Sequence, residues 1–154
     1  MKVNQINTSY ITVFFNKLKA FFSLMKLRLS SLVVMSAFFG FILADGDLLS
    51  YNFYLLMVGG VLVTGSANGF NQVIERKTDE LMYRTQNRPL PTKVLTKNEA
   101  IVFCFLIGAL GAYFLWLINI KSLMLGLMAI AIYVLIFTPL KKITPFAVFV
   151  GAIP

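Results

Sequence analysis

The sequence predicts an all-α membrane protein with four complete transmembrane spans and the start of a fifth. Of its 154 residues, 58% are hydrophobic and only 13% are charged, and the mean hydropathy is +0.81. These values are too apolar for a soluble domain of this length. The apolar residues also form runs that approach the roughly 20 residues a helix needs to cross the hydrocarbon core of a bilayer. Because the charged residues lie mainly between these runs, we expect membrane-spanning helices joined by polar connections.

Residues 1–28 are predicted to form an interfacial, amphipathic N-terminus. The segment mixes basic with aromatic side chains: Lys17 and Lys19 with Phe14, Phe15, Phe21 and Phe22. This mixture is typical of a helix on a membrane surface. A cleaved signal peptide is the alternative, but Lys26 and Arg28 interrupt the apolar run and no small-residue cleavage pattern follows cleanly. We therefore place one membrane domain at residues 29–154.

The first two spans are predicted at Leu29–Ala44 and from Tyr54 to about Gln72. The sequence Asp45-Gly46-Asp47 ends the first span. The second span contains many small residues, which allow close helix contacts in a membrane or contact with a ligand: Gly59, Gly60, Gly65, Ser66, Ala67 and Gly69.

Prolines and a capping motif separate the second span from the third. Pro89 and Pro91 stop a helix and favour extended backbone in the residues before them. The sequence Thr96-Lys-Asn-Glu99 matches a capping box. The third span is therefore predicted from near Lys97 through Ile118.

The fourth span is predicted at Ser122–Leu140, after the connection Asn119-Ile120-Lys121, and a fifth apolar segment begins at Ile143. Five Lys and Arg residues precede the first span, six lie between the second and third spans, two follow the fourth, and only Lys121 lies elsewhere. The positive-inside rule then places the N-terminus and the acidic-basic loop 73–99 in the cytoplasm. We expect a multi-pass protein of the inner (plasma) membrane.

Composition also excludes several kinds of chemistry. The chain has no His, which is the commonest metal ligand and the usual acid or base near neutral pH. Cys104 is the only cysteine and lies within an apolar run, so an intrachain disulfide is impossible. The net charge of +8 comes from Lys and Arg that flank apolar segments, where they set orientation and meet anionic lipid, so we expect no nucleic acid partner.

One segment concentrates the acids and bases of the chain. Asn71, Glu75 and Asp79 are spaced four residues apart, so a helix turning by about 100° per residue places all three on one face. Arg84 and Arg88 follow, again four residues apart. Carboxylates that repel each other on one face near a membrane indicate a cation between them.

An alternative interpretation is a solvated loop whose charges form surface pairs, such as Arg76 with Glu80. Against it, Asn68, Asn71 and Gln72 lie where the second helix is still at membrane depth, and polar groups there face a cavity or a partner rather than lipid. Two guanidinium groups also suit phosphate oxygens.

A diphosphate bound with Mg²⁺ is the ligand that fits these residues best. Mg²⁺ prefers one or two carboxylates together with substrate phosphates, whereas Ca²⁺ takes more oxygen ligands. Because the diphosphate would sit beside apolar helices, we expect its organic part to be a lipid-like chain. The aromatic residues along the spans, Tyr133 among them, are interpreted as mostly lipid-facing, with the lining of a substrate pocket as the alternative.

Two motifs resemble those of the UbiA-type intramembrane prenyltransferases, and within them the branch that farnesylates protoheme IX (the heme O synthases). The first is Asn71-x3-Glu75-x3-Asp79-x2-Met82-x-Arg84-Thr85-x2-Arg88-Pro89-Leu90, and the second is Phe137-Thr138-Pro139-Leu140-Lys141-Lys142-Ile143-Thr144-Pro145. The resemblance covers nearly all of the chain after its first twenty residues. A departure is Lys26-Leu27-Arg28 in place of the family's usual Lys-Pro-Arg.

The resemblance implies a UbiA-like helix bundle and a Mg²⁺-dependent transfer of farnesyl from farnesyl diphosphate to a vinyl group of heme B. It assigns the metal and the catalytic role to Asn71, Glu75 and Asp79. Five further residues are assigned to substrate binding: Arg84, Thr85, Arg88, Lys141 and Lys142. A role in setting membrane orientation explains the two lysines equally well. The partners implied are the lipid bilayer, farnesyl diphosphate, heme B as a substrate, and heme-modifying or oxidase-assembly proteins.

Two alternatives remain open. One is a prenyltransferase of the same type that acts on a quinone precursor, and the other is a non-enzymatic transporter or assembly subunit. Members of the family also carry a second acidic motif and further helices. We therefore expect the chain to correspond to the N-terminal half of such an enzyme and to be inactive by itself.

Overall fold

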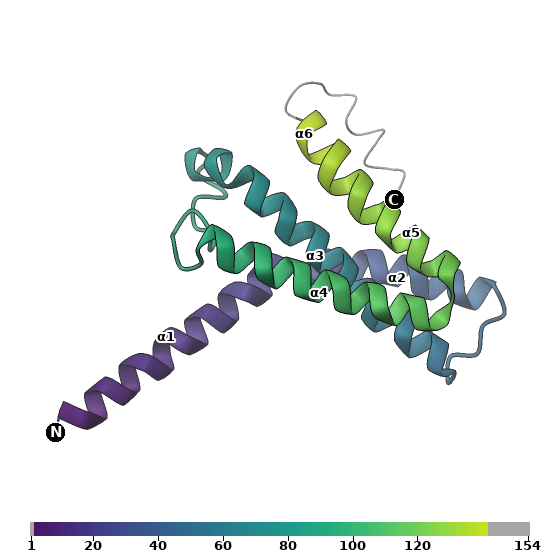
Figure 1. The fold of residues 1–154 in the computed structure, drawn as a ribbon, viewed down its shortest axis with the longest axis horizontal. Coiled ribbons are helices and arrows are strands. Elements are labelled where there is room, and N and C mark those ends of the chain that lie inside the picture. Colours follow the sequence, from purple (N-terminus) through teal and green to yellow (C-terminus); the bar gives the residue numbers. More distant parts are fainter. Residues whose placement is uncertain (1, 142–154) are drawn as a thin grey trace.

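The computed structural model describes residues 2–141, with side chains from residue 12 onward, and every regular element in that range is helical (Figure 1). The elements in order are α1 (Lys2–Met25), α2 (Leu27–Leu43), α3 (Tyr51–Leu81), α4 (Lys97–Ile118), α5 (Ile120–Ala131), the π-helical segment η1 (Ile132–Phe137) and α6 (Thr138–Leu140). The prediction of an all-α fold is confirmed. Lys142 and the apolar segment predicted from Ile143 lie outside the described residues.

Within the described residues, three helices are long and apolar enough to cross a membrane: α3, α4 and the continuous helix Ile120–Leu140. A fourth candidate is the pair formed by Thr12–Met25 and Leu27–Leu43, which is bent by 42° between its two halves. The predicted third span matches α4 at both ends. The fourth begins at Ile120, earlier than expected, because Asn119 alone joins it to α4 and its Oδ1 accepts a hydrogen bond from Ser122 N at 2.8 Å.

The predicted capping box at the start of α4 is present. Thr96 Oγ1 accepts a hydrogen bond from Glu99 N at 3.2 Å, and Glu99 Oε2 accepts one from Thr96 N at 2.8 Å. Each bond satisfies an amide that the first helical turn leaves without a partner, which fixes where the helix begins. Glu99 Oε1 also accepts a hydrogen bond from Lys17 Nζ at 2.6 Å, so the cap of α4 is tied to α1.

Helix α3 lies at the centre of the bundle and packs most closely against α4, with which it runs side by side (Figure 1). Glycines form this contact: a methyl group on Gly108 would lie 2.6 Å from Ser66 Oγ, and one on Gly59 would lie 3.2 Å from Gly111 O. Ser66 Oγ donates a hydrogen bond to Cys104 O at 2.8 Å. In lipid the hydrophobic effect does not drive helices together, and small residues stabilise the contact by letting two backbones approach closely. The small residues predicted to form a contact surface therefore do so.

The predicted interfacial N-terminus is divided from the first span by a break at Lys26. This residue has φ 48° and ψ 54°, in the left-handed backbone region that residues other than glycine rarely adopt. Side chains from the neighbouring helices hold the end of α1 at the break. Ser30 Oγ donates to Met25 O at 2.8 Å, Asn68 Nδ2 donates to the same oxygen at 3.4 Å, and Gln72 Nε2 donates to Leu24 O at 2.9 Å. Two of the polar residues expected to face a cavity or a partner, Asn68 and Gln72, therefore bind the last carbonyls of another helix.

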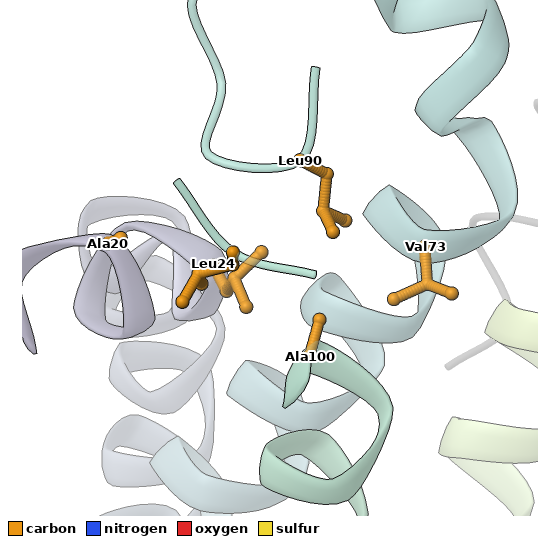
Figure 2. Packing of buried hydrophobic residues seen from close by; sticks show 6 residues of the cluster. Ala20, Leu24, Val73, Leu90 and Ala100 are labelled. Atoms are coloured by element: carbon orange, nitrogen blue, oxygen red, sulfur yellow. The ribbon is translucent and has the colours of Figure 1, made fainter. Parts of the chain in front are cut away.

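A small apolar cluster joins α1 and the connection between α3 and α4 to the bundle (Figure 2). It consists of buried residues from α1, α3, the connection and α4: Ala20, Leu24, Val73, Leu90, Leu95 and Ala100. Because burial of apolar side chains stabilises the contact, the connection that carries the predicted arginines is anchored rather than free in solvent.

Candidate functional site

The acidic face lies on the last turns of α3. This helix continues to Leu81, so Asn71, Glu75 and Asp79 are all helical, and the connection outside helices runs only from residue 82 to 96. Asn71 is 2% exposed and Asp79 is 4% exposed, and the Glu75 side chain is 12% exposed. Carboxylates that are this buried need partners of opposite charge or a metal.

Two cations meet this face, one from the connection that follows α3 and one from a distant part of the chain. Lys141 Nζ lies 2.7 Å from Glu75 Oε1 and also donates to Asn71 Oδ1 at 3.3 Å. Arg88 Nη1 lies 2.6 Å from Asp79 Oδ2. The structure thus brings Asn71, Glu75, Asp79, Arg88 and Lys141 together in one group, which we call the polar cluster.

Thr85 and Arg84, also predicted to bind substrate, lie outside the polar cluster. Thr85 is buried and its Oγ1 donates to Asp79 O at 3.0 Å, which closes the turn after α3. Arg84 is exposed and takes part in none of the ion pairs of residues 12–141. The alternative pair of Arg76 with Glu80 is not among those ion pairs either, and Arg76 Nη1 instead donates to Val73 O at 3.0 Å.

Sequence reasoning did not include Lys26 in the site. Its ammonium lies within electrostatic range of both carboxylates and both cations of the polar cluster. Burial, together with Arg88 and Lys141, lowers the pKa of Lys26 from its ordinary value. The available signal was the position of this basic residue at the junction of two apolar segments, within the sequence Lys26-Leu27-Arg28.

A π-helical segment was also missed. In η1 the rings of Tyr133 and Phe137 stack at 5.2 Å with an angle of 26° between their planes. Thr138, which follows, donates from Oγ1 to Tyr133 O at 2.8 Å and to Asn71 Oδ1 at 3.1 Å. The end of this helix is therefore bound to the acidic face of α3 through Thr138 and Lys141.

An apolar cavity of about 340 Å³ lies between α2, α3 and the helix that contains α5 and η1. Its walls include Leu29 and Val33 from α2, Val63 and Asn68 from α3, and Tyr133 and Phe137 from η1. Asn68 precedes Asn71 by about one helical turn, and Phe137 directly precedes Thr138, so the cavity adjoins the polar cluster. Tyr133 lines this cavity, which agrees with the alternative interpretation of the aromatic residues as a pocket lining.

The polar cluster does not form a metal site from protein ligands alone. No group of three or more His, Cys, Asp or Glu side chains in the part of the chain that the structure describes is arranged to hold a metal ion. Glu75 and Asp79 are each paired through one carboxylate oxygen. Two carboxylates and an amide oxygen on one face fit Mg²⁺, which completes its coordination with substrate phosphates and water.

Known proteins similar to this chain are prenyltransferases by name. Residues 33–154 match the UbiA prenyltransferase family. The protoheme IX farnesyltransferase of Cytophaga hutchinsonii is 42% identical over 141 residues, which are 90% of this chain and 49% of the relative. The enzyme of the same name from Christiangramia forsetii is 42% identical, with 89% of this chain and 46% of the relative covered.

The protoheme IX farnesyltransferase of Myxococcus xanthus is 39% identical over 86% of this chain and 45% of the relative. The chain thus spans about half the length of the curated relatives it matches. No solved structure matches it. The apolar helices and the family match together show an integral membrane protein. With most of its length matched, this chain belongs to the UbiA prenyltransferase family.

Proposed function

We propose that the chain supplies the diphosphate-binding part of a protoheme IX farnesyltransferase. The reaction transfers a farnesyl group from farnesyl diphosphate to a vinyl group of heme B and yields heme O, on the route to the heme of terminal oxidases. The observation that supports this most directly is the polar cluster, with two carboxylates and two cations beside an apolar cavity. The choice of heme B as the acceptor is supported by the similar proteins, which are named protoheme IX farnesyltransferase.

In this proposal, Glu75 and Asp79 hold Mg²⁺ through carboxylate oxygens, and Asn71 provides a third oxygen or holds a water. When bound, the ion would act as a Lewis acid that stabilises the negative charge of the departing diphosphate. Arg88 and Lys141 bind phosphate oxygens. Arg84 and Lys142 are assigned to substrate binding by the sequence motifs alone, and Lys142 lies outside the described residues. Thr85 acts by closing the turn that positions Arg88, as its hydrogen bond to Asp79 O indicates.

Binding of substrate would require an exchange of partners in the polar cluster. In the structure each carboxylate is paired with a cation, Glu75 with Lys141 and Asp79 with Arg88. A diphosphate gives both cations a partner of higher charge, and the carboxylates then become available to the metal. The cluster therefore stays neutralised both before and after binding, which avoids buried unpaired charge.

The cavity accommodates the prenyl chain in this proposal. Its volume of about 340 Å³ lies at the lower end of the range of about 300–1,000 Å³ that is common for small-molecule sites. Its lining is mostly apolar, so the chain would be removed from water while the diphosphate remains in the polar cluster. The distribution of Lys and Arg supports a location in the inner (plasma) membrane with the polar cluster at the cytoplasmic side.

The experiment that tests this function measures transfer of labelled farnesyl to heme B. It uses membranes that contain the full-length protein of which this chain is a part. We expect heme O to form with Mg²⁺ and not with EDTA, and activity to be lost in Glu75→Gln and Asp79→Asn. Glu80→Gln is the matched control, because Glu80 is an exposed carboxylate on the same helix.

Two outcomes would contradict the proposal. If another aromatic acceptor is prenylated and heme is untouched, the protein is a prenyltransferase that acts on a quinone precursor. If a folded, full-length protein transfers farnesyl to no acceptor, the polar cluster is a binding or structural element.

A further inference from the structure

The rings of Tyr133 and Phe137 belong to the one π-helical segment among the described residues. A π-helical turn adds a residue to the helix and changes which side chains face a given direction, and such turns are frequent at functional sites. Here the widened turn stacks the two rings and directs both into the cavity wall. The hydrogen bond from Thr138 Oγ1 to Tyr133 O, at 2.8 Å, holds the turn in this form.

Phe137 lies where the apolar cavity meets the polar cluster. The ammonium of Lys141 is 5.4 Å from the centroid of its ring, and the same nitrogen is 2.7 Å from Glu75 Oε1. A positive charge held next to the acidic face therefore already sits over this ring. Rings attract cations within about 6 Å of the centroid because the ring face carries negative charge density.

We infer that Phe137 is a further catalytic residue, whose ring stabilises positive charge on the first carbon of the allylic substrate, and that Tyr133 holds the ring in place. This inference rests on the proposed function. The bond between that carbon and the diphosphate oxygen breaks, and the electron pair leaves with the diphosphate. The carbon then bonds to the vinyl group of the acceptor, and water adds to the resulting cation, giving a hydroxyl group and one released proton.

The location explains why an aromatic residue suits this position. The carbon that becomes positive is bonded to the diphosphate on one side and to the apolar chain on the other, so it must lie at the border of the two regions. Phe137 is the cavity-lining residue next to Thr138, which itself contacts Asn71. An interaction that strengthens only as charge develops raises the rate of the chemical step and leaves substrate binding nearly unchanged.

The test replaces Phe137 with phenylalanines that carry one, two or three fluorine atoms in the full-length protein in membranes. Fluorine withdraws charge density from the ring face with little change in ring size. We expect kcat for farnesyl transfer to fall with each fluorine, by about tenfold in all, while KM for farnesyl diphosphate stays within about twofold. The same fluorinated residues placed at Phe103 are the control, since that ring of α4 packs against Phe21 of α1 and does not line the cavity.

A second readout does not depend on the acceptor. An ammonium analogue of the farnesyl group, bound together with inorganic diphosphate and Mg²⁺, should bind more tightly than its neutral isostere, and trifluorination of Phe137 should remove that preference. If the wild type transfers farnesyl but neither kcat nor this preference responds to fluorination, the inference is overturned and the proposed function stands. If the preference responds but heme is not the acceptor, Phe137 has the inferred role and the proposed acceptor is wrong.

Discussion

Lys141 Nζ lies 2.7 Å from Glu75 Oε1, and this ion pair joins the end of the last described helix to the acidic face of α3. The Glu75 side chain is 12% exposed and that of Lys141 is 31% exposed, so the pair is only partly shielded from solvent. The same lysine contacts Asn71 and Phe137. One cation thus connects the predicted metal-binding face with the aromatic lining of the cavity.

This pair should show coupling in stability. Glu75→Gln and Lys141→Gln should each destabilise the chain by about 1–3 kcal/mol, because each leaves a partly buried charge without its partner. The double variant should lose less than the sum of the two. Thermal unfolding in detergent micelles compares the stability of the wild type, the two single variants and the double variant. Additive losses of stability would show that the interaction between Glu75 and Lys141 contributes nothing to stability.

Substitution of Arg88 and substitution of Arg84 are expected to have different effects on KM for farnesyl diphosphate. Arg88→Lys keeps the charge but loses the planar fork that suits two phosphate oxygens, so KM for farnesyl diphosphate should rise about tenfold. Arg84→Lys should change KM by less than about twofold, because the structure leaves Arg84 exposed and outside the ion pairs of residues 12–141. Steady-state kinetics of the full-length protein distinguishes them, and equal effects would contradict the arrangement of the polar cluster.

The contact between α3 and α4 should be sensitive to a single methyl group. Gly108→Ala places a methyl 2.6 Å from Ser66 Oγ, which is held by its bond to Cys104 O and cannot move without losing it. We expect a loss of about 1–3 kcal/mol in stability.

Gly40→Ala is the matched control for that substitution, since no atom other than the adjoining residues and nearby backbone of its own helix lies within 4 Å of the added methyl. It should be neutral or stabilising by up to about 1 kcal/mol, because alanine favours helix. Unfolding temperatures in micelles compare the two variants. A Gly108→Ala protein as stable as Gly40→Ala would mean that the helices are not packed as closely as the structure shows.

The break at Lys26 permits a test of backbone strain. Lys26→Asn and Lys26→Gln both remove the charge, but asparagine tolerates a φ of 48° better than glutamine does. The asparagine variant should therefore be the more stable of the two by about 1 kcal/mol. If the two variants unfold at the same temperature, the left-handed conformation carries no cost that matters to stability.

Local rules let the sequence determine much of this protein by itself. The apolar runs identified the three described helices that are long and apolar enough to cross a membrane. The Thr96–Glu99 capping box located the start of α4, because capping and helix periodicity involve residues only a few positions apart. The spacing of Asn71, Glu75 and Asp79 determined that they share a face for the same reason. The small residues of the second span likewise indicated a close helix contact, although they did not indicate which helix is the partner.

Only the tertiary structure decided how these local elements are combined. Nothing near Glu75 in the sequence shows that Lys141 is its partner, and nothing near Asn68 shows that it binds Met25 O. The break at Lys26 and the π-helical turn that carries Phe137 also depend on contacts with α3. These features arise because buried polar groups must find partners wherever packing brings them together, and packing joins residues that are far apart along the chain.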